Sequence, residues 1–212
     1  FLCPILYTMI GSLNGNTMDD VGQIERLTQN RVVKLFRDKL QYTYLGNLED
    51  DPTNSNIEEI NLLEYLTNKA GYPEALAKRA IYLLKAEANR SDRNLYNNNK
   101  EVYKLLRYGV EVTAGPGERY QRIQFIHWDA PEKNDFGIAE EVTFRGYREK
   151  RPDIVLYVNG IAVGVLELKR STVSIGDGIR QSIVNQQKEF IEEFFPTIQL
   201  VMAGNDTEGL RY

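Results

Sequence analysis

The stretch RPDIVLYVNGIAVGVLELKRS, residues 151–171, decides the fold more than any other part of the chain. Two runs rich in β-branched residues, 154–158 and 161–169, flank the pair Asn159 and Gly160. Asn-Gly between two such runs is the strongest short-range signal for a two-residue β-hairpin. The stretch therefore predicts two adjacent antiparallel strands in an otherwise apolar setting.

Charged residues end the second of these strands. Because side chains alternate along a strand, Glu167 and Lys169 are expected to share one face with Val163 and Val165. A carboxylate and an ammonium on a near-buried strand are unfavourable unless they are paired or functional. Taken alone, the two residues fit a structural ion pair or a solvated strand end as well as a reactive site.

A second carboxylate, Asp153, stands at the start of the first strand, directly after Pro152. Two carboxylates would leave Mg²⁺ with open positions for water and a phosphate oxygen, and a nearby lysine would stabilise developing charge. A simple two-residue loop, however, pairs Asp153 with Leu166 and places it on the face away from Glu167. The site therefore requires a β-bulge, a longer loop or a bend at Pro152 and Asp153.

Elsewhere, hydrophobic periodicity predicts an α/β chain whose first half is largely helical. Helices are expected at 19–40, from Ser55 as N-cap to Lys69, from Pro73 through Leu84, and as a short piece around Leu105, with loops at 47–56 and 91–100. Further strands are expected at 122–128, 140–144 and 198–202, the last preceded by a helix capped by Ser174 and Asp177 and ended by Pro196.

These patterns divide the chain into three parts. Residues 1–18 are interpreted as an upstream remnant or a docking segment, 19–110 as a helical part, and 111–212 as a β-rich core that carries the hairpin and the following helix. The chain begins FLCPILYTMI, an apolar run too short to span a bilayer and without the basic start of a signal peptide. We expect no membrane partner.

Composition sets further limits on a chain of 212 residues. The single cysteine, Cys3, excludes an internal disulfide, so a cytoplasmic location is predicted. The net charge of −4, from 26 basic and 30 acidic residues, does not indicate DNA binding by overall charge. Phosphate contacts would then come from local basic clusters beside acidic metal ligands.

The residues RPD followed by ELK resemble the nuclease motif of the PD-(D/E)xK superfamily. The whole stretch 151–171 is similar to the N-terminal nuclease region of the motor and endonuclease (R) subunit of type I restriction enzymes, a resemblance that covers most of the chain from about Gln29. Further matching segments are NKEVYKLLRYGV (99–110), NDFGIAEEVTF (134–144), GIRQ (178–181), FF (194–195), AGND (203–206) and GLRY (209–212).

The resemblance implies a restriction-endonuclease-like core, with a mixed central β-sheet flanked by helices. It also implies Asp153 and Glu167 as Mg²⁺ ligands, the carbonyl of Leu168 as a further possible ligand, and Lys169 as the catalytic lysine. Family members often carry a QxxxY motif on the following helix. Gln181 fits the glutamine position, but Asn185 replaces the tyrosine.

Supporting roles are less sharply indicated. Gln181 and Asn185 share a helix face. One interpretation is that they hydrogen-bond DNA or support Lys169, and the other is that they form an ordinary polar helix face. The superfamily often adds a glutamate from an early helix, and Glu58 or Glu59 is the candidate, although either also suits a first-turn position. His127 is interpreted as structural, since no second histidine or nucleophile motif accompanies it.

Basic residues surround the motif, and they would contact phosphates without reading bases, with solvated surface charge as the alternative. They are Arg145, Arg148, Lys150 and Arg151 before it and Arg170 and Arg180 after it.

No GxxxxGK[ST] loop occurs, so ATP binding is expected only in a motor region of a longer parent chain, of which these residues would be an N-terminal fragment. The resemblance implies double-stranded DNA and the methyltransferase and specificity subunits of a restriction-modification complex as partners. It implies an Mg²⁺-dependent endonuclease domain whose parent couples cleavage to ATP-driven translocation. The alternatives are a free-standing repair or resolvase nuclease of the superfamily and a non-catalytic domain that binds DNA or docks subunits.

Overall fold

The computed structural model describes residues 21–115 and 117–212, so the interpretation of residues 1–18 lies outside the described residues. The helices are α2 (Val21–Asp38), α3 (Glu59–Glu64) with a π-helical continuation (Tyr65–Lys69), α4 (Glu74–Ala88), α5 (Leu95–Tyr108) and α6 (Ile175–Asn185), with 3-10 turns at Pro131–Lys133 and Glu192–Thr197. The strands are β1 (Thr43–Asn47), β2 (Val110–Val112), β3 (Gln121–Ile123), β4 (Phe136–Glu140), β5 (Phe144–Arg145), β6 (Glu149–Lys150), β7 (Ile154–Val158), β8 (Ile161–Leu168), β9 (Leu200–Asn205) and β10 (Gly209–Arg211).

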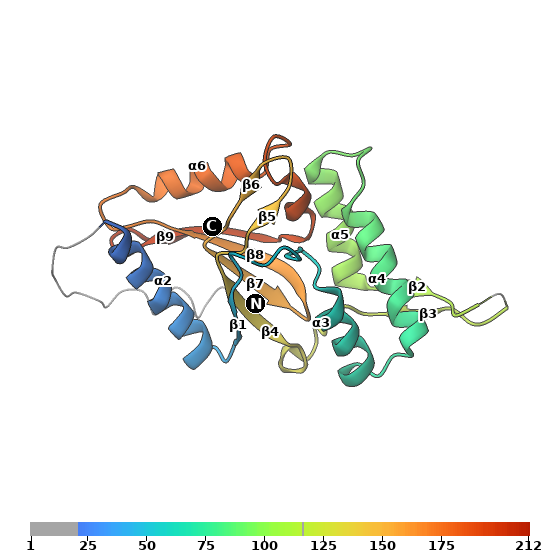
Figure 1. The fold of residues 1–212 in the computed structure, drawn as a ribbon. Coiled ribbons are helices and arrows are strands. Elements are labelled where there is room, and N and C mark those ends of the chain that lie inside the picture. Colours follow the sequence, from blue (N-terminus) through green and yellow to red (C-terminus); the bar gives the residue numbers. More distant parts are fainter. Residues whose placement is uncertain (1–20, 116) are drawn as a thin grey trace.

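A mixed six-stranded sheet in the order β1-β4-β7-β8-β9-β10 forms the centre of the molecule (Figure 1). The strands β4, β7 and β8 pair antiparallel, whereas β1 with β4 and β8 with β9 pair parallel. All five side chains of β7 are buried, as expected for a strand covered on both faces. The fold is therefore the mixed α/β sheet flanked by helices that was expected.

Each face of the sheet is covered by different elements. Phe36 of α2 packs with Ile154, Leu166 and Leu168 on one face, and its ring makes an edge contact with Tyr42 at 5.0 Å. The opposite face carries a second hydrophobic cluster, which includes residues of the 3-10 segment Glu192–Thr197. On this face α6 lies along β8 and β9 (Figure 1). Glu167 lies on the α6 side, because its neighbours Leu166 and Leu168 point toward α2.

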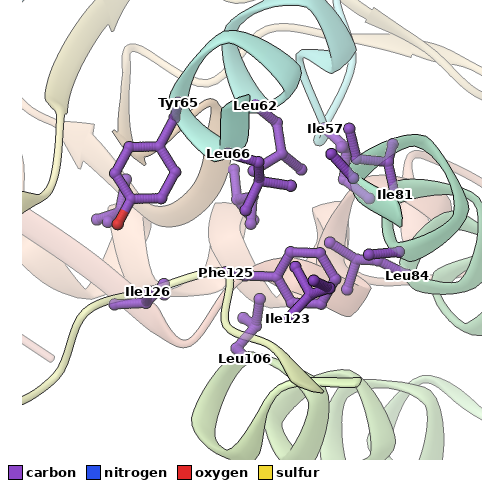
Figure 2. Close-up of a cluster of buried hydrophobic side chains, with 14 of the residues drawn as sticks. Ile57, Leu62, Tyr65, Leu66, Ile81, Leu84, Leu106, Ile123, Phe125 and Ile126 are labelled. Atoms are coloured by element: carbon purple, nitrogen blue, oxygen red, sulfur yellow. The ribbon is translucent and has the colours of Figure 1, made fainter. Parts of the chain in front are cut away.

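The helices α3, α4 and α5 enclose a separate cluster at the turn end of the hairpin. Figure 2 shows Leu62, Leu66, Leu84 and Phe125 converging in it, all fully buried. Burial of each such side chain stabilises the fold by roughly 2 kcal/mol. This cluster fixes the end of β7 and β8 that is remote from the charged strand ends.

The Asn-Gly turn forms as predicted. Asn159 and Gly160 have φ of 54° and 82°, which suits a two-residue hairpin turn with both central residues left-handed. A Cβ at Gly160 would lie 2.8 Å from the backbone nitrogen of Leu62, so glycine also permits α3 to approach. The Asn159 side chain donates to the carbonyl oxygen of Phe125 at 2.8 Å, which anchors the turn.

Several sequence-based boundaries were wrong. Ser55 does not cap the second helix: α3 starts after Glu58, and the Ser55 hydroxyl accepts from the backbone N–H of Ile57 instead. Pro196 does not end α6, which stops at Asn185. Asp177 completes no capping box but pairs with Arg180, while Ser174 does cap the helix by accepting from Gly176 at 3.2 Å.

The polar run 91–100 was also misjudged as a loop, since α5 begins at Leu95 within it. Asn94 is the N-cap and accepts from Asn97 at 2.9 Å. Asn99 reaches across to the 3-10 segment, where its amide donates to the carbonyl oxygens of Pro196 at 3.1 Å and Ile198 at 2.6 Å. Asparagines are poor helix formers in isolation, and these tertiary hydrogen bonds outweigh that preference.

The strands differ from those expected at several places, since β2, β5, β6 and β10 were not expected and the strand expected at 198–202 is β9, Leu200–Asn205. The expected strands 122–128 and 140–144 are represented by β3 and β4, both shifted toward the N-terminus, and the strand β1 was not expected at all. Because β1 is an edge strand of the central sheet, the sheet draws on the part of the chain that was expected to be helical. Among the described residues no helix has the length and apolar character needed to cross a membrane.

Candidate active site at the ends of β7 and β8

Of the three irregularities that the sequence allowed, the structure has the β-bulge, and it lies in β8. Leu156 pairs with Gly164 but Tyr157 pairs with Ala162, so Val163 is an extra residue. As a result Ala162 and Val165 point into the same cluster, and the expected grouping of Val163 with Val165 was wrong. Beyond the bulge Ile154 pairs with Leu166, and continuing this register by one residue places Asp153 opposite Glu167.

Three hydrogen bonds hold Asp153 at the strand end. Its carboxylate accepts a 2.6 Å hydrogen bond from the backbone N–H of Leu168. Its carbonyl oxygen accepts from the backbone N–H of Glu141 at 3.0 Å and from the side-chain amide of Gln29 at 3.3 Å. The carboxylate is therefore held against the segment that carries Glu167 and Lys169.

Glu167 is almost fully buried, with 1% of its surface exposed. Its carboxylate accepts from the side-chain amides of Gln181 at 2.7 Å and Asn185 at 3.2 Å, both on α6. Burial, and next the negative charge of Asp153, raise the pKa of Glu167 to about 8, against a smaller lowering by Lys169. Without a cation, the site therefore favours the protonated form of Glu167 at neutral pH.

Gln181 connects the two ends of the motif. Its side-chain oxygen accepts from the Lys169 ammonium at 2.7 Å while its amide nitrogen donates to Glu167. Close approach of α6 makes this possible, since a Cβ at Gly178 would lie 3.1 Å from the Cβ of Ala203 and 3.4 Å from Cγ of Lys169. The structure thus brings Gln181 and Asn185 to the strand ends, where they contact Glu167.

Two residues near Asp153 were missed by sequence reasoning. Gln29 is a buried polar residue of α2 that also donates to the Glu141 carboxylate at 3.1 Å, and nothing in the helical pattern distinguishes it. Glu141 has a left-handed φ of 52° and pairs with Arg151 at 2.8 Å. The adjacent carboxylates at 140 and 141, following an apolar strand, were an available but unused signal.

Glu58 and Glu59 are not brought to this site. The backbone N–H of Glu58 donates to the carbonyl of Gly160 at the hairpin turn, at 2.8 Å. Six residues of β8 lie between Gly160 and Glu167, which corresponds to about 20 Å of strand. Glu59 forms an exposed ion pair with Lys85. The expectation that an early-helix glutamate joins the carboxylates is therefore not supported by their positions.

The basic residues fall into two groups, those with and those without a carboxylate partner. Arg145 pairs with Glu149 at 3.2 Å, Arg151 with Glu141, and Arg180 with Asp177. Arg148 and Lys150 instead lie over the ring of Phe190. Arg170, directly after Lys169, is half-buried.

His127 has the structural role that was expected. Its Nδ1 accepts from the backbone N–H of Ala130 at 3.1 Å, and its own backbone N–H donates to Asn134 at 2.8 Å. These contacts hold the turn before the 3-10 helix Pro131–Lys133.

The donor set fits a hard divalent cation. Asp153 and Glu167 supply carboxylate oxygens from adjacent strands, and the Leu168 backbone lies between them and Lys169. A bound cation would relieve the burial and repulsion that raise the pKa of Glu167. No group of three or more His, Cys, Asp or Glu side chains suited to a metal occurs in the described part of the chain, so remaining ligands would be backbone, water or substrate.

Comparison with known proteins defines the class of this domain. Residues 23–212 match the family model described as the type I restriction enzyme R protein N terminus. The chain belongs to this family of R protein N-terminal regions.

Individual relatives agree with the family model. The chain is 31% identical over 102 residues to a protein of Methanocaldococcus jannaschii named as the MjaVIIP endonuclease subunit of a type I restriction enzyme. It is 32% identical over 74 residues to the corresponding MjaVIIIP subunit of the same organism. These alignments cover 46% and 34% of this chain but only 9% and 7% of the relatives, so the chain corresponds to a small part of their length.

Proposed function

We propose that this domain is an Mg²⁺-dependent endonuclease with a PD-(D/E)xK core, which hydrolyses phosphodiester bonds of double-stranded DNA. The observation that carries the proposal is the bulge at Val163, because it turns two carboxylates that a regular hairpin would separate toward one another. A structural ion pair would need one carboxylate beside Lys169. Two carboxylates side by side, one of them buried, are unfavourable in their charged forms without a cation, which is why the pKa of Glu167 is raised to about 8.

In this proposal each residue has a separate task. Asp153, Glu167 and the carbonyl of Leu168 hold Mg²⁺, which when bound polarises the phosphate and acidifies a water molecule. Lys169 orients the attacking water and stabilises charge on the phosphate oxygens. Gln181 positions the Lys169 ammonium through the 2.7 Å hydrogen bond, and Asn185 orients the Glu167 carboxylate.

The family suggests the wider setting of the reaction. We propose that the domain works in the R subunit of a type I restriction-modification system, together with methyltransferase and specificity subunits that select the DNA site. ATP-driven translocation would belong to another part of that longer subunit, since this sequence contains no phosphate-binding loop. Recognition of a target sequence is accordingly not assigned to this domain.

Calorimetric titration of Mn²⁺ or Mg²⁺ tests the metal site directly. The parent chain should bind metal, whereas Asp153→Ala and Glu167→Ala should each weaken binding at least about tenfold. Glu58→Gln and Glu59→Gln are matched controls, because these carboxylates lie at the other end of the hairpin. Nicking of plasmid DNA by the assembled complex should depend on Asp153, Glu167 and Lys169.

The alternatives give different results. Unchanged metal binding and nicking in both alanine variants would leave Asp153 and Glu167 as structural residues and remove the nuclease proposal. Metal-independent DNA binding without nicking would favour a domain that only binds DNA or docks subunits. Nicking by the isolated chain, without partner subunits, would favour a free-standing repair or resolvase nuclease.

A further inference from the structure

A short hairpin of β5 and β6 stands beside the candidate site. In Figure 1 it is drawn between α6 and α5, and its second strand ends at Lys150, three residues before Asp153. Its cations are stacked on one aromatic ring: the guanidinium of Arg148 lies 5.5 Å, and the ammonium of Lys150 4.6 Å, from the centre of Phe190. We call these three side chains the Phe190 stack.

The Phe190 stack is held in a fixed position relative to Glu167. A Cβ at Gly146 would lie 2.5 Å from the carbonyl oxygen of Phe190, so glycine allows the hairpin tip to contact the backbone there. The next residue, Ile191, donates from its backbone N–H to the carbonyl of Asn185 at 3.2 Å. Asn185 in turn donates to Glu167, which connects the stack to the buried carboxylate.

The two cations of the stack differ from the other arginines around the site. Neither Arg148 nor Lys150 forms an ion pair with a carboxylate in the described residues, whereas Arg145 and Arg151 both do. Lys150 precedes Asp153 by three residues in the chain, so the stack is close in sequence to the first of the two carboxylates. An aromatic face orients a cation without neutralising its charge.

A pair of oriented cations beside two metal-binding carboxylates suits a phosphate backbone. Cations held by stacking lose less conformational freedom on binding an anion than free side chains do. Contacts of this kind position a duplex without reading its sequence. The adjoining hollow of about 410 Å³ carries Glu192 and Glu193 as well as basic residues, so it offers no comparable excess of positive charge.

We propose that the Phe190 stack binds backbone phosphates of duplex DNA and positions the strand beside Asp153 and Glu167. Arg148 and Lys150 make the phosphate contacts, and Phe190 is a positioning residue that orients them. The inference deepens the proposed nuclease function and rests on it for the purpose of the contact. Phosphate binding itself is measured without metal and without cleavage.

The test measures binding of duplex DNA to the chain in EDTA, with fluorescence anisotropy as the readout across a salt series. The logarithm of the binding constant falls by about 0.9 per tenfold rise in salt for each phosphate contact. Arg148→Ala and Lys150→Ala should each reduce this slope by about 0.9. A variant that binds as well as the parent at 1 M salt should therefore bind about eightfold more weakly than the parent at 0.1 M. Lys150→Arg should retain the slope.

Two kinds of control separate a DNA contact from damage to the fold. Arg145→Ala removes an exposed, paired arginine of the same hairpin and should leave the slope unchanged. Phe190→Leu and Gly146→Ala keep every charge and should weaken binding by displacing the cations, with far-ultraviolet circular dichroism and melting temperature reporting the fold.

The phosphate-binding inference and the nuclease proposal can each fail without the other. If Arg148→Ala and Lys150→Ala keep the parent slope, or the parent shows no salt-dependent DNA binding, the inference is wrong even where cleavage requires Asp153. If the slopes fall as expected while Asp153→Asn has no effect on nicking, the phosphate contact stands and the nuclease proposal fails. In the assembled complex, loss of the contact should raise KM more than it lowers kcat.

Discussion

The backbone N–H of Leu168 donates a 2.6 Å hydrogen bond to the carboxylate of Asp153. Leu168 lies between Glu167 and Lys169, so this bond attaches the carboxylate of one strand to the backbone of the next. The bulge at Val163 makes the contact possible, since it moves Asp153 from the level of Leu166 to that of Glu167. The same bond offers a way to remove the charge of Asp153 without removing its anchor.

Asp153→Asn should keep the fold and weaken metal binding. The asparagine oxygen still accepts from Leu168, while the loss of one anionic ligand should reduce Mn²⁺ affinity at least about tenfold. Removing a charge that raises the pKa of Glu167 should leave the metal-free chain at least as stable. Calorimetry and urea unfolding measure both effects, with exposed Asp135→Asn as the control, and parent-like Mn²⁺ affinity would contradict the ligand role.

The protonation of Glu167 should make stability and metal binding depend on pH in opposite ways. Its pKa is raised from 4.5 to about 8, so between these values the metal-free native state holds a proton that the unfolded chain releases. The contribution of Glu167 to stability is therefore fully present below about pH 4.5 and lost as pH rises through about 8. Unfolding free energies of the parent relative to Glu167→Gln should fall over this range.

Metal affinity should rise over the same interval, because a divalent cation displaces that proton. Binding of Mn²⁺ should strengthen about tenfold per pH unit up to about pH 8 and then level off. Calorimetry in buffers of different ionisation enthalpy gives the number of protons released. An affinity that does not change between pH 6 and pH 8, beyond about twofold, would show that Glu167 is already ionised in the metal-free chain.

Gln181→Ala should impair cleavage more than it impairs folding. The substitution removes the hydrogen bonds to Lys169 and to Glu167 at once, and loss of such supporting partners typically costs about 10- to 100-fold in activity or metal affinity. Gln187→Ala is a matched control on an exposed glutamine just beyond the same helix. Equal nicking rates for the two variants would mean that Gln181 only fills space on α6.

Asn99→Ala should destabilise the chain by about 1 to 3 kcal/mol, because it leaves buried carbonyl oxygens of the 3-10 segment without their donor. Asn97→Ala, on the exposed side of α5, is expected to change the free energy of unfolding by less than about 0.5 kcal/mol. Urea unfolding of the two variants compares them directly. Similar values would show that α5 does not depend on this contact with the 3-10 segment.

The sequence by itself determined the elements whose signals are local. The Asn159 and Gly160 turn, the strand 154–158 and the Ser174 cap all formed as predicted, because the responsible interactions lie within a few residues. Family membership was likewise recognisable from the motif and the segments around it. The need for a bulge, a longer loop or a bend followed from counting residues, although the choice of a bulge and its location did not.

Tertiary structure alone decided where the polar residues went. Asn99 lies in a helix because distant carbonyl oxygens bind its side chain, and Gln29 is buried because Glu141 and Asp153 accept its hydrogen bonds. Glu58 is remote from the charged strand ends because the hydrogen bond from its backbone N–H to the carbonyl of Gly160 places α3 at the hairpin turn. Such outcomes depend on contacts between residues more than fifty positions apart, which no local pattern encodes.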